Sequence, residues 1–217
     1  MRRGKWFRVL MCLSVLGASG CVGAVDRADF EDRIRTRGGG LVSALPREAI
    51  AAVARRIGAT DLEANLILLT APNSTQFRLV LHDQPDQVTR FLADGQNLAA
   101  RQATARLRVR PPDRSRQLDD YSFTLGDLSA PSPVRVSAYD DLDGENFTVG
   151  AVPALTRIED IVDTARAQSA LPDGQVTVIL VSRFGGDVRV VANVVSARSE
   201  VVVEFDHTGA FLRMRQV

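Results

Sequence analysis

Besides its carboxylates and hydroxyls, this sequence has few side chains suited to chemistry: two cysteines, two histidines and a short series of alternating arginines. A cysteine thiolate is a nucleophile and a metal ligand. An imidazole is a general base or a metal ligand, and a guanidinium binds carboxylate and phosphate groups. The residues around each group decide which of these reactions the sequence supports.

Cys21 follows three small residues, Ala18, Ser19 and Gly20, which end an apolar stretch over 9–18. Basic residues precede that stretch, so residues 1–20 have the pattern of an export signal, with an apolar part too short to span a bilayer. The ASGC junction resembles the bacterial lipobox. This resemblance implies that Cys21 receives a diacylglycerol, that a lipoprotein signal peptidase cuts before it, and that lipid anchors the mature chain to the extracytoplasmic face of the cell membrane. The alternative is an ordinary secretory signal in which Cys21 is incidental.

The two histidines give no sign of a catalytic or metal site. His82 adjoins Asp83, but neighbours on a strand point to opposite faces of a sheet. His207 lies in the segment FDHTG, where turn formation is a sufficient reason for the polar residues. The sequence also lacks a GxSxG nucleophile elbow and an HExxH zinc motif. We therefore expect no catalytic residues and no metal.

An acidic cluster in the segment YDDLDGEN superficially resembles a calcium loop. Aligning its carboxylates with such a loop puts Tyr139 at the first position and Gly150 at the twelfth, where acidic ligands are required. We interpret the segment as a solvated hairpin tip. Its acidic residues are Asp140, Asp141, Asp143 and Glu145.

Three arginines, Arg106, Arg108 and Arg110, alternate with apolar residues in the segment ARLRVRP. In a strand this alternation puts the three guanidinium groups on one face. Such a face could contact anionic lipid headgroups or envelope polymers near the anchor. The alternative is a solvated edge strand that its charges keep soluble.

The composition excludes several classes of function. The only lysine, Lys5, lies in the signal, so the mature chain has no group for a Schiff base, pyridoxal phosphate or a Walker-type phosphate site. Cys12 also lies in the signal, which leaves no thiol besides Cys21 for catalysis or a disulfide. The remaining chain is slightly acidic, so we expect no nucleic-acid partner and no cofactor.

Two similar segments must position these side chains. A helix beginning at Pro46 and a helix near 156–165 have apolar residues at the same spacing, and Thr156 with Glu159 has the pattern of a capping box. Strand-like runs follow each helix. In the first copy they lie at 65–70, 77–82 and 87–95, and in the second at 175–182, 188–195 and 200–209. The sequence therefore contains an internal repeat.

These patterns predict an α+β fold with two related halves, each a helix followed by an antiparallel meander. An arginine- and proline-rich linker and a β-hairpin segment join the halves. The expected boundaries are the signal at 1–20, a lipidated Cys21 with a tether and short helix at 21–45, the first repeat at 46–101, the linker and β segment at 102–155, and the second repeat at 156–217.

The helix, the meander and the closing segment VEFDHTGAFLRM resemble PepSY-type extracytoplasmic modules, over 46–101 and 156–217. The whole chain also resembles exported lipoproteins of high-GC Gram-positive bacteria. The PepSY resemblance implies an inhibitory or regulatory binding unit, and neither resemblance supplies catalytic residues. We expect a non-catalytic envelope module that engages an envelope protein or polymer. A carrier of an apolar ligand such as a lipid is the second hypothesis, and a hydrolase is the third.

Overall fold

The computed structural model describes residues 41–74, 84–94 and 101–217. The helices in these ranges are α2 (Ala44–Ile57), α3 (Asp86–Asp94), α4 (Leu142–Glu145) and α5 (Ile158–Ser169), with short 3-10 turns η1 (Val149–Ala151) and η2 (Pro153–Thr156). The strands are β1 (Glu63–Thr70), β2 (Thr104–Arg110), β3 (Asp119–Thr124), β4 (Asp127–Leu128), β5 (Ser132–Pro133), β6 (Phe147–Thr148), β7 (Gln175–Phe184), β8 (Asp187–Val195), β9 (Glu200–Asp206) and β10 (Phe211–Gln216).

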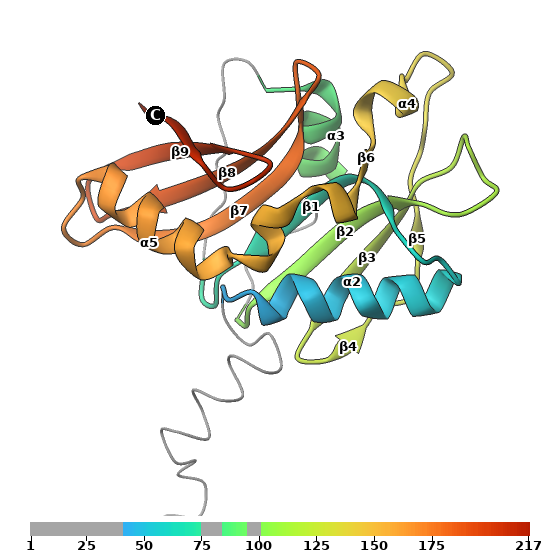
Figure 1. Cartoon of the computed structure of the whole chain (residues 1–217), viewed down its shortest axis with the longest axis horizontal. Helices are drawn as coiled ribbons and strands as arrows, with labels where there is room; N and C mark the ends of the chain where they lie inside the picture. The colour runs from blue at the N-terminus through green and yellow to red at the C-terminus, as the bar shows by residue number, and fades with distance from the viewer. Residues whose placement is uncertain (1–40, 75–83, 95–100) are drawn as a thin grey trace, which may run out of the picture.

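One antiparallel sheet contains all of these strands, in the order β10-β9-β8-β7-β1-β2-β3-β4. The short strands β5 and β6 pair with β3 and β1. Figure 1 shows the sheet extending continuously from the C-terminal strands to the strands of the first half. The two halves therefore share a single sheet, and the pairing of β1 with β7 joins them.

Strands β1 and β7 occupy corresponding positions in the two halves and pair with each other. The same sequence spacing separates Glu63 from Gln175, which begin β1 and β7, and Leu68 from Leu180. Leu68 and Leu180 are also direct partners across the two strands. Beyond this pair of strands, β2-β3-β4 and β8-β9-β10 extend outward as matching meanders. Helices together with one large antiparallel sheet confirm the predicted α+β fold.

Several elements of the first half differ from the prediction. Residues 87–95 were expected to form a strand, but 86–94 form helix α3. Val88 and Phe91 are buried one turn apart on one side of this helix, a spacing that suits a helix packed on a sheet. Residues 104–110 and 119–124, expected in a linker and hairpin, are β2 and β3 of the main sheet. The expected strand at 77–82 lies outside the described residues.

The two faces of the sheet have separate apolar cores. Helices α2 and α5 cover one face (Figure 1), where Leu45 and Ile161 pack in the same buried cluster as Ile67. Helix α3 covers part of the opposite face, where Phe91 packs with Leu68. Successive residues of β1 thus enter different cores, as the two-residue period of a strand requires.

The N-termini of α2 and α5 lie together and form hydrogen bonds with each other. The Ser43 hydroxyl accepts a hydrogen bond from the Ile158 N–H at 2.9 Å, and the Ser43 N–H donates to Glu159 Oε1 at 3.0 Å. The predicted capping box is therefore wrong, because Glu159 binds the start of the other helix. The Thr156 hydroxyl instead donates to the carbonyl of Pro153. The Ile158 N–H of α5 and the N–H of Ser43, the residue before α2, thus gain hydrogen-bond partners.

Candidate functional site

A cavity of about 540 Å³ lies where the end of α3 meets β2, β3 and the segment that follows β4. Serine side chains and the edge of β5 complete its rim. We call it the arginine cavity after its charged lining, which consists of Asp94, Arg106, Arg108, Asp120 and Arg135.

Strand β2 and helix α3 position two of these arginines. Arg106 and Arg108 alternate with buried apolar residues of β2, so both leave the sheet on the face that α3 covers. Their guanidinium carbons lie 4.4 Å and 4.9 Å from the centre of the Phe91 ring. Because Phe91 is fully buried in the α3 core, both guanidinium groups make cation–π contacts with a core residue.

Arg108 is a buried cation with two carboxylate partners. Its side chain is only 2% exposed, and its Nε and Nη2 donate to the two oxygens of Asp120 at 2.8 Å and 2.9 Å. Nη2 also donates to Asp94 at 3.1 Å. Burial lowers the pKa of Arg108, but the hydrogen bonds and charges of Asp120 and Asp94 outweigh burial and raise it. Arg108 is therefore fully compensated within the protein.

Arg106 is compensated much less. Its side chain is 19% exposed, and its approach to Asp120 is 3.9 Å, beyond hydrogen-bond length. Both oxygens of Asp120 already accept from Arg108. Burial is the main cause that lowers the pKa of Arg106, the attraction of Asp120 opposes it, and the charge of Arg108 lowers the pKa further. Arg106 thus brings positive charge to the cavity wall.

Arg110 belongs to a different environment. It pairs with Glu63, its neighbour across β1, and with Asp143 of α4. The hydrogen bond that Arg110 donates to the Asp143 carboxylate is the main cause that raises the pKa of Arg110. The adjoining cavity, of about 570 Å³, also contains the carboxylates of Asp61 and Asp113. Arg110 therefore lies in acidic surroundings.

The expectation of a solvated edge strand at these three arginines is wrong. Strand β2 lies inside the sheet between β1 and β3, and Arg108 is buried. Contact of Arg106, Arg108 and Arg110 with an anionic surface stays a prediction, but their environments now distinguish them. Only Arg106 combines an exposed fraction with weak compensation.

The predicted acidic hairpin tip is a short helix whose carboxylates have structural partners. Asp141 caps α4 by accepting from the Gly144 N–H at 3.0 Å, and Asp143 pairs with Arg110. Asp140 and Glu145 both bind Arg90 of α3, at 3.1 Å and 2.9 Å. Within the described ranges, no group of three or more histidine, cysteine or acidic residues is placed to hold a metal.

The structure places the remaining predicted residues as follows. Ala18, Ser19, Gly20, Cys21 and His82 lie outside the described residues. His207 lies in the turn between β9 and β10, where its carbonyl accepts from the Ala154 N–H. It lines none of the three cavities described in this section. Among the described helices, none is both long and apolar enough to cross a membrane.

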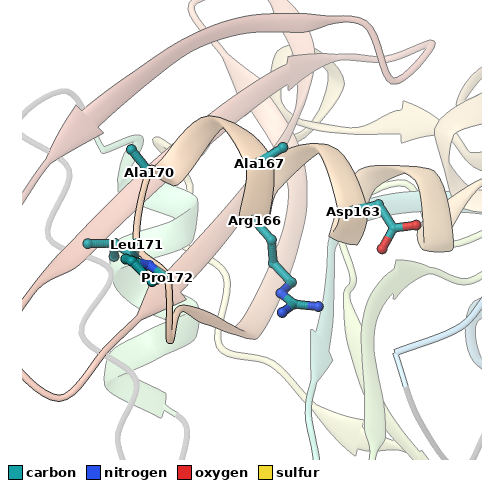
Figure 2. A pocket seen from close by; sticks show the side chains of 6 residues that line it. All are labelled: Asp163, Arg166, Ala167, Ala170, Leu171 and Pro172. Atoms are coloured by element: carbon teal, nitrogen blue, oxygen red, sulfur yellow. The ribbon is translucent and has the colours of Figure 1, made fainter.

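A third cavity, of about 520 Å³, lies at the C-terminal end of α5. Figure 2 shows the Arg166 side chain on the outside of the helix, between Asp163 and the turn at Leu171 and Pro172. Arg166 and Asp163 are exposed. This shallow site is a weaker candidate than the arginine cavity, because it contains no buried charge.

Sequence reasoning missed most of the arginine cavity. Asp94 was expected in the strand-like run over 87–95, and Phe91, Asp120 and Arg135 were not considered as site residues. Val88, Phe91 and Leu92 are spaced by three and four residues, as on one side of a helix. This spacing is the sequence signal that could have revealed α3 beneath the arginines.

Comparisons with known proteins give one distant structural match. No protein-family model matches the chain, and no curated protein matches it. A solved structure described as a putative lipoprotein from Clostridium difficile 630 superposes with a TM-score of 0.44 and 9% identity, covering 78% of this chain and 90% of that chain. At this low similarity the match carries no argument about function.

Proposed function

We propose that the protein is a lipid-anchored extracytoplasmic module of the bacterial envelope that binds a partner without catalysing a reaction. Lipid on Cys21 holds it at the cell membrane, and the folded part presents the arginine cavity to an envelope protein or polymer. The composition of this cavity is the observation that supports the binding role. Charged side chains line a cavity on the sheet that opens to solvent.

The chemistry of the cavity suits recognition better than catalysis. Guanidinium groups stay protonated at any physiological pH, so Arg106 and Arg108 do not act as proton acceptors. Asp120 is bound through both oxygens by Arg108 and serves as its counter-ion. A fork of fixed donors that matches carboxylate and phosphate geometry is a recognition device.

The anchor follows from the first 21 residues. A charged start, a short apolar stretch and the ASGC junction fit a lipoprotein signal. The acyl chains of a diacylglycerol give stable membrane attachment, whereas one chain binds marginally. Such an anchor concentrates the module at the membrane, so that even a weak site meets its partner often.

The two other hypotheses gain no specific support. An apolar carrier needs an enclosed apolar cavity, but each of the three cavities described here opens to solvent and has charged side chains in its lining. A hydrolase that uses a histidine places it in a polar cleft, and His207 lines none of these three cavities, while His82 lies outside the described residues.

Metabolic labelling of the full chain with an alkynyl fatty acid in a bacterial host tests the anchor. The parent and Cys12→Ala should both incorporate label and partition into detergent, since Cys12 is removed with the signal. Cys21→Ala should lose the label and leave an uncut precursor or a released product. Equal labelling of Cys21→Ala and the parent would contradict the proposal.

A second experiment tests the binding role with the lipidated parent chain in non-ionic detergent. Envelope extract is passed over the immobilised protein, and the retained component is compared with the same component in the extract. We expect it to be retained and chemically unchanged. A retained component that is recovered cleaved or modified would refute the non-catalytic role.

A further inference from the structure

The arginine cavity has an excess of positive charge. Arg106, Arg108 and Arg135 supply three guanidinium groups, and Asp94 and Asp120 supply two carboxylates. Both carboxylates bind Arg108. Arg108 with its two carboxylates carries −1, and Arg106 with Arg135 carries +2, so the net charge of the lining is +1.

Arg106 and Arg135 have guanidinium groups that remain available to bind a ligand. Arg106 makes only the 3.9 Å approach to Asp120 among the ion pairs of the described residues. Arg135 is exposed and has no ion pair with a described residue. Hydroxyl groups also line the cavity, on Ser122, Ser129 and Ser132. Two guanidinium forks and neutral hydroxyl donors together match the oxygens of a single acidic group.

We propose that the arginine cavity binds one monoanionic oxyanion group, a carboxylate or a phosphodiester, between Arg106 and Arg135; this rests on the proposed binding role and names the class of ligand. The net charge of +1 balances a monoanion. A dianion brings excess negative charge close to Asp94 and Asp120, which like-charge repulsion disfavours. The volume of about 540 Å³ lies in the range of small-ligand sites.

The core beneath the cavity gives this site its rigidity. The guanidinium carbon of Arg106 lies 4.4 Å from the centre of the Phe91 ring, and Arg108 forms an ion pair with Asp120 beside it. Because the Arg106 side chain is already ordered, a ligand loses little of its binding free energy to ordering it. Arg135, on an exposed segment, is the more adaptable partner.

Calorimetric titration of the mature lipidated chain in non-ionic detergent tests this site. The probes are N-acetylalanine as a carboxylate, glycerophosphoglycerol as a phosphodiester and sulfate as a dianion. We expect saturable binding of at least one monoanion, with weaker binding of sulfate. Arg106→Gln should weaken this binding about tenfold or more, and Arg135→Gln should weaken it about threefold or more. Arg166→Gln, at the exposed arginine of Figure 2, should leave it unchanged.

The outcomes separate the ligand sources and can overturn the inference. Binding of only the phosphodiester indicates a lipid headgroup or polymer phosphate, and binding of only the carboxylate indicates an acidic peptide or sugar. Tighter binding of sulfate than of both monoanions overturns the charge match. Absence of saturable binding, or equal binding by the parent, Arg106→Gln and Arg135→Gln, overturns the site itself. These measurements do not depend on where the protein lies in a cell, so they fail independently of the anchor experiment.

Discussion

Replacement of Asp120 by Asn should leave a buried cation short of its main counter-ion. Arg108 donates two hydrogen bonds to the Asp120 carboxylate, and its side chain is 2% exposed. The amide of Asn has one oxygen and no charge, so it replaces at most one of these bonds. Asp94 remains as the second partner, but its side chain is 57% exposed.

The size of the effect follows from burial. Removal of one partner from a buried ion pair typically costs roughly 3–5 kcal/mol, because the other charge stays buried without compensation. The remaining bond to Asp94 and the contact with Phe91 place Asp120→Asn near the lower end, at about 3 kcal/mol. For a chain of this size, that loss corresponds to a fall in Tm of roughly 6–12 °C.

Urea unfolding at neutral pH, followed by circular dichroism, measures this loss. Asp94→Asn is the matched control and should cost less than about 1 kcal/mol, since exposed ion pairs contribute little. The double variant Arg108→Met with Asp120→Leu should recover much of the stability, because it removes both charges from the buried site. A loss below about 1 kcal/mol for Asp120→Asn would refute the assignment of Arg108 as a buried cation dependent on Asp120.

Three further predictions concern the helix ends and the last turn. Ser43→Ala removes the acceptor for the first N–H of α5 and should cost about 1 kcal/mol in urea unfolding; an unchanged midpoint would contradict this mutual capping. Gly58 and Ala170 end the two helices in left-handed conformation, with φ of 71° and 55°. Ala170→Gly should therefore raise the free energy of unfolding and Gly58→Ala should lower it, by about 1 kcal/mol each in urea unfolding; changes of the same sign would refute this reasoning. A hydrogen bond from the Thr208 hydroxyl is the main cause that lowers the pKa of Asp206. The ionised form therefore stabilises the fold above the unfolded pKa near 3.8, and this contribution disappears as the pH falls through the folded value; the Tm difference between Asp206→Asn and the parent should be largest near neutral pH and shrink in acid, and a constant difference would contradict it.

The regular parts of the fold could be predicted because their signals are local. The burial of Ile158, Ile161 and Ala165 on one side of α5 follows from their helical spacing in the sequence. Strands β7, β8 and β9 are long apolar runs separated by turn residues, so their positions were clear. The repeat was detectable for the same reason, since both halves begin with a helix and a strand of one pattern.

The candidate site could not be predicted because long-range contacts create it. The burial of Arg108 depends on Asp120 across the sheet and on Phe91 from a helix that was expected to be a strand. The alternation of charge in β2 fitted a solvated strand equally well, since a sequence does not show what covers the polar face. The predicted strand positions of the first repeat were wrong after β1, because α3 is inserted between β1 and β2 of the meander.

The join between β1 and β7 makes the sheet depend on a late event in folding. The Ser182 hydroxyl donates to the Asn65 carbonyl across this join, although 117 positions separate the two residues. Until β7 has been synthesised, the side of the apolar strand β1 that pairs with β7 has no partner. Pairing of segments so far apart in the sequence is slow. The first half therefore leaves one side of β1 without its partner until the second half supplies β7 and completes the sheet.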